Sequence, residues 1–194
     1  MISKKILSLS AVALLAVTLG ACSSDNSSDS SASSSSAPAT SETAASSSAD
    51  VLSTASVSSD PAVLEKALSA DGNWIVAATS DITFDKDVTV AGEFHNKGDD
   101  TQDIYRKFAL YSQDEDRNVT AEYTIKVPEL IVESEGFNIV HGTVDGNILV
   151  KANNFVLDGA KVNGNVTFEK QEYKDSAKLE ENDAKVEGEV TVSE

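Results

Sequence analysis

Residues 124–168 alternate between apolar and polar positions, and the alternation recurs with a period of about 18 residues, as in stacked structural repeats. The aligned apolar positions are Leu130, Ile148 and Val166; Val132, Val150 and Phe168; Phe137 and Phe155; Ile139 and Leu157; and Val144 and Val162. Alternation places such side chains on one face of a strand. The pattern therefore predicts short strands stacked in register.

A shared motif, Val-x-Gly-x-(Val/Ile/Phe), extends the repeat. It occurs around Gly146 and Gly164, again around Gly188 after a short insertion, and more weakly at 88–94. We predict an all-β domain, a single-stranded parallel β-helix (β-solenoid) with right-handed coils of about 18 residues. The insertion, "QEYKDS", is predicted to form a loop. The repeated glycines suit corners that need a positive φ or a close approach of two backbones.

Two other folds compete with this interpretation. Antiparallel hairpins would also give short strands, although they would not require a repeated register. A left-handed helix with a six-residue repeat fits Val144, Val150, Val156, Val162 and Phe168. That second fold would turn Phe155 and Leu157 outward.

A short helix is predicted before the repeats. Asp60 is a suitable N-cap, Pro61 suits the first helical position, and Leu64 and Leu68 supply an apolar face up to Gly72. This helix is expected to cap the first coil, with Trp74 beside it. The remaining apolar runs are short, β-branched or aromatic, and bounded by Asn, Asp, Gly or Ser.

The N-terminal segment 1–59 differs in composition from the rest of the chain. Residues 1–21 combine Lys4 and Lys5 with a short apolar run, as in a secretory signal peptide. Residues 22–59 are rich in serine and lack apolar periodicity, which predicts a disordered linker. The β-helical domain is expected to occupy residues 60–194.

Leu19-Gly20-Ala21-Cys22 resembles the lipobox of bacterial lipoproteins. The resemblance implies cleavage before Cys22 and lipidation of its sulfur. It also implies a lipid anchor on the extracytoplasmic face of the cell membrane. Two acyl chains hold a protein firmly where a single chain exchanges. Cys22 is the only cysteine, so no intramolecular disulfide can form.

Val144-Asp145-Gly146-Asn147-Ile148 and 162–166 resemble the repeats of bactofilins, bacterial proteins that polymerise through a β-helical core. They are also broadly similar to other right-handed β-helices, including the pectate-lyase type. The resemblance covers about residues 126–192. It implies a β-helical fold and, from bactofilins, self-assembly. The lipobox and the acidic insertions between 96 and 118 depart from the bactofilin pattern.

The charge excludes one class of partner. The chain has a formal net charge of −17, and most of the excess lies after residue 59. An acidic surface repels phosphate backbones, so nucleic-acid binding is not expected.

Residues for catalysis or for a cofactor are scarce. Neither His95 nor His141 has a partner at metal-ligand spacing, and no glycine-rich phosphate loop occurs. The acidic runs 99–103 and 114–116 could bind calcium, although solvated loops are the simpler interpretation. We expect no cofactor, no metal and no enzymatic activity.

One basic and aromatic run is the candidate contact with a partner: Tyr105, Arg106, Lys107 and Tyr111. An amphipathic strand with solvated charges is the alternative. The sequence thus favours a non-enzymatic lipoprotein that binds a component of the cell envelope, such as a wall polymer, or has a structural role. Self-assembly at the membrane and a calcium-dependent carbohydrate-active enzyme are the alternatives.

Overall fold

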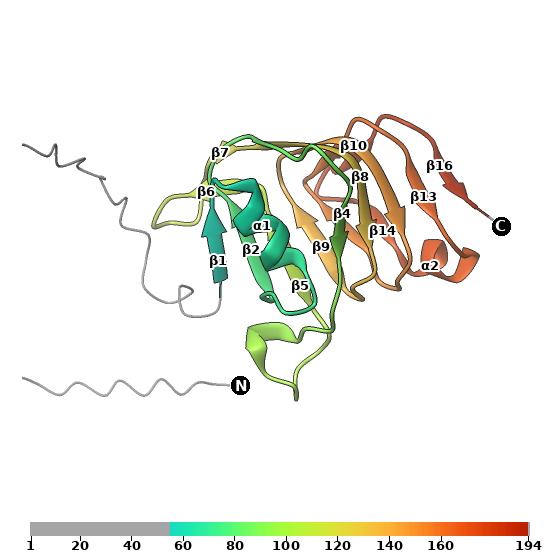
Figure 1. The fold of residues 1–194 in the computed structure, drawn as a ribbon, viewed down its shortest axis with the longest axis horizontal. Helices are drawn as coiled ribbons and strands as arrows, with labels where there is room; N and C mark the ends of the chain where they lie inside the picture. The colour runs from blue at the N-terminus through green and yellow to red at the C-terminus, as the bar shows by residue number, and fades with distance from the viewer. Residues whose placement is uncertain (1–54, 194) are drawn as a thin grey trace, which may run out of the picture. The chain divides into compact units, whose positions relative to one another are not determined.

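The computed structural model describes residues 55–193 (Figure 1). Most of its hydrophobic core is formed by side chains of parallel strands in two sheets. The first sheet contains, in spatial order, β1 (Ala55–Ser58), β2 (Ile75–Ala78), β5 (Arg106–Ala109), β9 (Phe137–Val140), β11 (Val156–Asp158) and β14 (Lys178–Glu181). The second sheet contains β3 (Ile82–Thr83), β4 (Val88–Val90), β8 (Thr124–Val132), β10 (Thr143–Val150), β12 (Lys161–Val162), β13 (Val166–Phe168), β15 (Lys185–Val186) and β16 (Val190–Val192). Neighbouring strands in both sheets run parallel.

Positions that the sequence repeat aligns are neighbours in the second sheet. Ile148 of β10 is level with Leu130 on one side and with Val166 on the other, and Val144 is level with Val162. All five side chains are buried. Their predicted alignment is therefore confirmed, and their burial explains why these positions are apolar.

The predicted single-stranded β-helix with regular coils is wrong. Within residues 55–193 the strands are grouped in three separate sheets, parallel and antiparallel, and two α-helices also form. The interval between paired strands is not constant. The insertion read from the sequence lengthens it from Val162 to Val186, and this predicted alignment is confirmed. The interval from Ile82 to its partner Ile125 is much longer and was not predicted. The prediction extended to the whole domain a period that holds only near residues 130–168.

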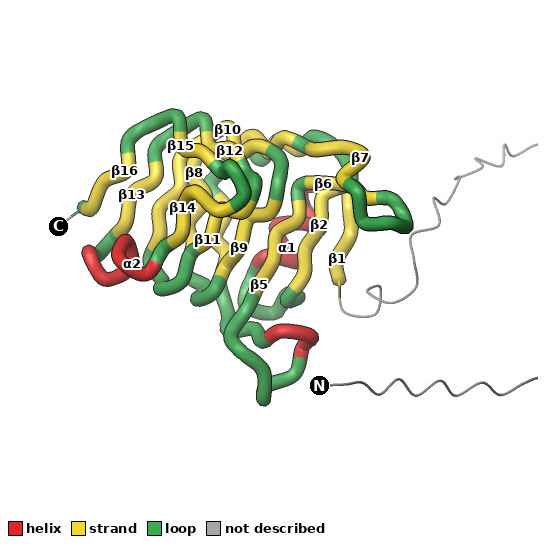
Figure 2. Tube along the Cα trace, turned by 180° about the vertical axis from the view of Figure 1, so that it is seen from behind, coloured by secondary structure: helices red, strands yellow, loops and turns green. Residues whose placement is uncertain are grey.

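Two insertions leave the sheets between paired strands. The hairpin of β6 (Tyr111–Gln113) and β7 (Val119–Glu122) forms the two-stranded antiparallel sheet. The segment before β5 contains the short 3-10 helix η1 (Asn96–Gly98). Both project from the sheets in Figures 1 and 2. In residues 55–193, antiparallel pairing is confined to this hairpin and to the bridge between His95 and Ile104.

Helix α1 (Pro61–Leu68) begins as the sequence predicts. The Asp60 carboxylate accepts hydrogen bonds from the backbone N–H groups of Ala62 and Val63. These bonds satisfy two of the donors that a helix start leaves unpaired. The helix ends at Leu68, somewhat before Gly72. Its buried residues join the core cluster, so α1 covers one end of the core.

Two boundaries differ from the expectation. The segment Gln171–Ser176 forms helix α2 instead of an irregular loop, and Tyr173 of this helix packs against the core. The described chain begins with β1, so a strand occupies residues that the sequence assigns to the linker. Residues 1–54, which include the predicted signal peptide, Cys22 and most of the linker, lie outside the described residues.

Candidate ligand-binding surface

Strand β5 divides the predicted contact residues between the two faces of the first sheet. Successive side chains of a strand point to opposite faces. Arg106 and Phe108 are fully buried in the core, whereas Tyr105 and Lys107 are half-buried on the outer face. Tyr111 follows β5 and contacts Lys107. The structure thus brings three of the four predicted residues to the outer face of the first sheet, whose strands lie toward the viewer in Figure 2.

Arg106 is not available to a partner. Its side chain is 0 % exposed, and its guanidinium lies 4.1 Å from the centroid of the Phe94 ring. The guanidinium donates hydrogen bonds of 2.6 to 3.1 Å to the backbone carbonyls of Ala67, Ser69, Asn73 and Ala91. Burial lowers the pKa of Arg106 to about 10, which leaves it protonated at neutral pH. The prediction that Arg106 contacts a partner is therefore corrected, because the core uses all of this side chain.

Lys107, Tyr111 and His141 are in contact on the outer face. Lys107 Nζ donates a hydrogen bond of 2.7 Å to Tyr111 Oη. The Tyr111 ring meets the His141 ring edge-on, with 4.8 Å between their centroids. His141 Nδ1 lies 3.1 Å from Glu122 Oε1 of strand β7, so the hairpin helps to position the imidazole. We call Tyr105, Lys107, Tyr111 and His141 the outer-face cluster.

The backbone at the end of β9 holds His141 in place. His141 has a φ of 56°, and Gly142 follows with a φ of 64°. The backbone N–H of His141 donates a 2.8 Å hydrogen bond to the carbonyl of Asp158 in β11. A Cβ atom at Gly159 would lie 2.9 Å from His141 Nδ1, so the glycine leaves room for the imidazole.

Tyr105 extends the outer-face cluster toward β2. Its ring centroid lies 6.2 Å from that of Trp74, and the two planes are inclined at 59°. Burial raises the pKa of Tyr105, and the charges of Asp158 and Tyr111 add to this shift. The hydroxyl of Tyr105 therefore stays protonated at neutral pH and can donate a hydrogen bond.

Most of the other outward positions of β5 and β9 carry uncharged side chains. Ala109 and Val140 are only 6 % and 7 % exposed although alternation places them on the outer face. Asn138 is fixed by hydrogen bonds from its amide to the carbonyls of Gly136 and Arg106. The outward positions of β2, β5, β9 and β11 are Ile75, Ala77, Lys107, Ala109, Asn138, Val140, Val156 and Asp158. They carry one cation and one anion, so this part of the outer face is close to neutral.

Sequence reasoning missed His141 and Asp158 as members of this surface. A signal for Asp158 was present, because the alignment of Ile139 with Leu157 also places Val140 beside Asp158. No comparable signal joins β5 to β9. Lys107 pairs with Asn138, and the interval between them does not match the sequence repeat.

The remaining polar candidates are engaged with their own loops. His95 Nδ1 lies 2.7 Å from the carbonyl oxygen of Gln102, and this contact, followed by Glu93, raises the pKa of His95. Asp99 accepts two hydrogen bonds from Thr101. Asp114 accepts two from Asn118. Within residues 55–193, His, Asp and Glu side chains form no group of three or more that is placed to hold a metal ion.

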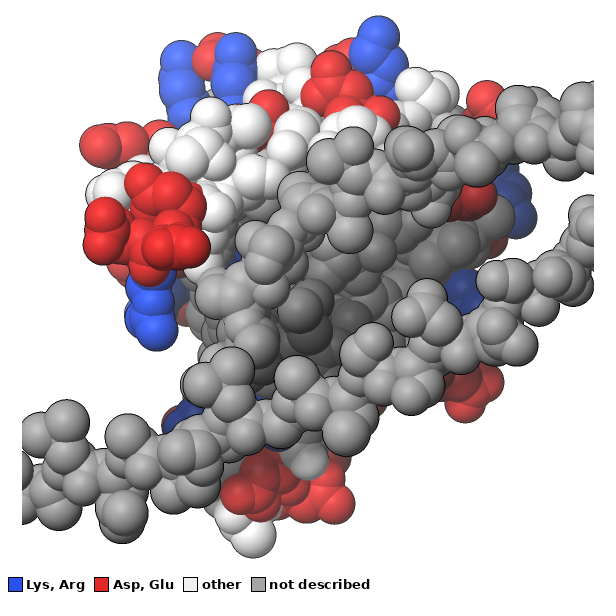
Figure 3. Space-filling view, turned by 90° about the vertical axis from the view of Figure 1, so that its left-hand side faces the viewer, with Lys and Arg blue, Asp and Glu red and all other residues white. Residues whose placement is uncertain are grey.

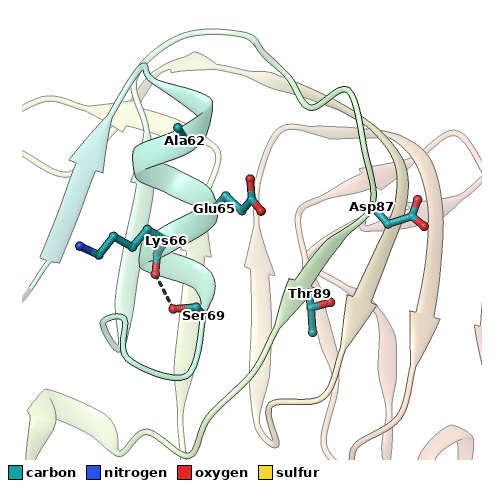
Figure 4. Close-up of a pocket in the computed structure, with 6 residues that line it drawn as sticks. All are labelled: Ala62, Glu65, Lys66, Ser69, Asp87 and Thr89. Carbon is teal, nitrogen blue, oxygen red and sulfur yellow. Dashed lines mark hydrogen bonds between the residues drawn. The ribbon is translucent and has the colours of Figure 1, made fainter.

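Two open grooves lie away from the outer-face cluster. The first, of about 490 Å³, lies between α1 and β4 (Figure 4), and its lining residues are Ala62, Glu65, Lys66, Ser69, Asp87 and Thr89. Glu65 forms an ion pair of 2.9 Å with Lys86, and Ser69 donates a hydrogen bond to the carbonyl of Lys66. The second groove, of about 390 Å³, is lined by Glu93, Glu133, Glu135 and Lys151, among others. Lys151 Nζ is 3.4 Å from Glu133 Oε1.

Comparisons with models of protein families, with curated proteins and with solved structures found no match to this chain. No helix within the described residues is both long enough and apolar enough to cross a membrane.

Proposed function

We propose that the protein is an extracytoplasmic lipoprotein that holds a binding domain close to the cell membrane. Cys22 carries the lipid, and the serine-rich residues that follow it connect the anchor to the folded part. The folded part binds a polymer of the cell envelope without chemical conversion. The observation that carries this proposal is the outer-face cluster, an open surface with aromatic rings on a sheet.

The contacts within the outer-face cluster support binding over catalysis. The Lys107 amine and the Tyr111 hydroxyl are bonded to each other, and His141 is paired with Glu122. A general base must reach the proton that it removes. These groups instead lie on an open sheet face and hold one another in position, which suits recognition of a ligand that lies across the sheet.

Cys22→Ala tests the lipid anchor. The wild-type chain, expressed in a bacterium that processes lipoproteins, should incorporate radiolabelled palmitate and sediment with membranes. The variant should lose the label, because only the cysteine sulfur can carry the diacylglyceryl group. Ser23→Ala is the matched control and should keep the label. A labelled Cys22→Ala variant, or an unlabelled wild-type chain, would contradict the anchor.

Binding to the envelope is tested by co-sedimentation of the full chain, in detergent, with purified cell-wall sacculi. We expect the protein to pellet with sacculi and to remain in the supernatant without them. Replacing Lys107 with Ala should weaken pelleting, whereas Lys126→Ala on β8 should not. Wild-type protein that stays in the supernatant in both conditions would refute envelope binding.

A second candidate function, self-assembly at the membrane, is favoured by a different observation. Leu179, Val186, Val190 and Val192 pack against the core but are only partly buried. They belong to β14, β15 and β16, each of which pairs on one edge only within the described residues. Open strand edges are templates for pairing with another chain. Pelleting without sacculi, as regular filaments under the electron microscope, would favour this function.

A further inference from the structure

We propose that the outer-face cluster binds an uncharged saccharide chain, with Tyr105 and Tyr111 as the two stacking residues. This inference rests on the proposed envelope binding and names the chemical class of the ligand. It does not depend on the lipid anchor.

The placement of two aromatic rings favours a saccharide. Tyr105 and Tyr111 lie on the same side of the first sheet, one before and one after β5. Both are half-buried: Tyr105 packs beside Trp74, whereas Tyr111 has the Lys107 amine over its ring and His141 edge-on to it, so both side chains are held in place and partly accessible to a ligand. An amphipathic ring with a polar tip suits a ligand that has both C–H surfaces and hydroxyl groups. A sugar ring has both.

Polar groups on the same face of the sheet can bond to the hydroxyls of a ligand. The Lys107 ammonium has three protons and gives one to Tyr111, so two remain for ligand hydroxyls. Asp158 accepts a hydrogen bond of 2.6 Å at one oxygen from Asn182, which leaves its second oxygen as an acceptor. Donors and acceptors thus lie together on one face, as a polyhydroxylated ligand requires.

The charge around the site favours a neutral ligand. The chain is strongly acidic, whereas the charged groups at the outer-face cluster are few: Lys107, Asp158, and Glu122, which is paired with His141. Acidic side chains gather in several groups on the face shown in Figure 3. A polyanion would be repelled by this surrounding field, and a polycation would prefer the acidic groups to the outer-face cluster. A neutral ligand fits the local balance best.

The open shape of the site suits an internal stretch of a polymer. Tyr105 precedes β5, Lys107 lies in β5, Tyr111 begins the hairpin at β6, and His141 follows β9. Neighbouring strands lie about 4.8 Å apart, so the outer-face cluster extends across more than one strand. All four residues of the cluster are partly exposed, and the two grooves lie elsewhere. An open surface accepts an internal stretch of a long chain, whereas a closed pocket selects a chain end.

The test is titration of the full chain, in a detergent that contains no sugar, with the hexasaccharide of N-acetylglucosamine. Trp74 is the only tryptophan of the chain, and its ring lies 6.2 Å from that of Tyr105. We therefore expect saturable changes in its fluorescence, checked by calorimetry. Tyr105→Ala and Tyr111→Ala should each weaken binding at least about tenfold, and Tyr111→Phe should weaken it less because the ring remains. Tyr173→Ala, on helix α2, is the matched control and should bind like the wild type.

The outcomes separate this inference from the proposed function. Binding to sacculi without binding to the hexasaccharide would overturn the saccharide and keep envelope binding. Hexasaccharide binding that survives both Tyr105→Ala and Tyr111→Ala would overturn the site. Tighter binding of polygalacturonate, a polyanion, would overturn the preference for a neutral chain. Circular dichroism of each variant shows whether a loss of binding is a loss of fold.

Discussion

Arg106 has the largest fully buried side chain of the described residues, and backbone carbonyls surround its charge. Two of these carbonyls, those of Ala67 and Ser69, lie at the end of α1, where each also accepts a backbone hydrogen bond, from Asn73 and Gly72 respectively. The guanidinium therefore joins α1, the segment after it and the start of β5. A charge in the core is tolerated here because hydrogen bonds to these acceptors replace those to water.

Replacement of Arg106 by Met should lower the free energy of unfolding by about 3 kcal/mol, because four carbonyls each lose a hydrogen bond from the guanidinium. Arg106→Lys should cost less, since it keeps the charge and loses only the forked geometry. Urea denaturation followed by circular dichroism measures both. Lys126→Met, at an exposed position of β8, is the control and should change stability little. Equal stability of Arg106→Met and the wild type would contradict this role.

The same residue marks a limit of reading function from sequence. Three of the four residues predicted to contact a partner do reach the outer face. Tyr105 and Lys107 are two positions apart in extended chain and so point to the same face, and Tyr111 follows them. Arg106 lies between Tyr105 and Lys107 and points to the opposite face, into the core. Its charge predicts a position in solvent. Its burial is explained by hydrogen bonds to carbonyls at the end of α1, a helix that lies far from Arg106 in the sequence.

In the second sheet, repeated glycines allow the backbones of neighbouring levels to approach each other closely. Gly146, Gly164 and Gly188 form a column in the second sheet, and a Cβ atom at Gly164 would clash with the carbonyl oxygen of Gly146. Beside this column, Asn147 Oδ1 accepts a 3.0 Å hydrogen bond from the backbone N–H of Asn165. Asn165 Oδ1 accepts a hydrogen bond of 2.9 Å from the backbone N–H of Glu189. Asn147 and Asn165 thus form a column in which each side chain bonds to the backbone of the next level.

Gly164→Ala should therefore destabilise the protein by about 1–3 kcal/mol, the usual cost of forcing an extra methyl group into a packed site. The reason is steric, since Gly164 does not have a positive φ. Thermal unfolding measures the effect. Asn163→Ala, at the adjacent exposed position, should leave the melting temperature nearly unchanged. Similar melting temperatures for Gly164→Ala and the wild type would show that the two backbones can separate at no cost.

The pairing of β8 with β10 and of β10 with β13 was predictable because the paired residues Leu130, Ile148 and Val166 are equally spaced along the sequence. Where insertions intervene, the sequence contains no fixed interval to follow. The segment around η1 separates β2 from β5, so the pair Val76–Phe108 could not be aligned in advance. The hairpin separates β5 from β8, and with η1 it also separates Ile82 from its partner Ile125. Extension of one local period to the whole domain produced the wrong fold.

At the scale of the whole molecule, charge dominates. The formal net charge of −17 comes from 32 acidic and 15 basic side chains, and the ion pairs of the described residues lie at the surface. Exposed pairs of this kind contribute little to stability. Mutual repulsion of the remaining carboxylates therefore opposes the compact state.

Added salt should stabilise the protein. Raising the ionic strength from about 0.01 M to about 0.15 M shortens the screening length from about 30 Å to about 8 Å, which weakens the repulsion. The melting temperature, followed by circular dichroism, should rise by a few degrees. The double variant Glu180→Gln and Glu181→Gln carries less charge and should show a smaller rise. A melting temperature that falls with sodium chloride would contradict net repulsion.

The hairpin between β5 and β8 has a practical consequence. The chain leaves the sheets at Tyr111 and returns at Thr124, where the backbone N–H donates a hydrogen bond to the distant Asp81 carboxylate. The turn at Asp114–Asn118 is exposed and closes on itself through those two residues. A short epitope spliced into this turn would be offered to an antibody without touching the core. Labelled intact cells and labelled lysed cells would then report on which side of the membrane the folded part resides.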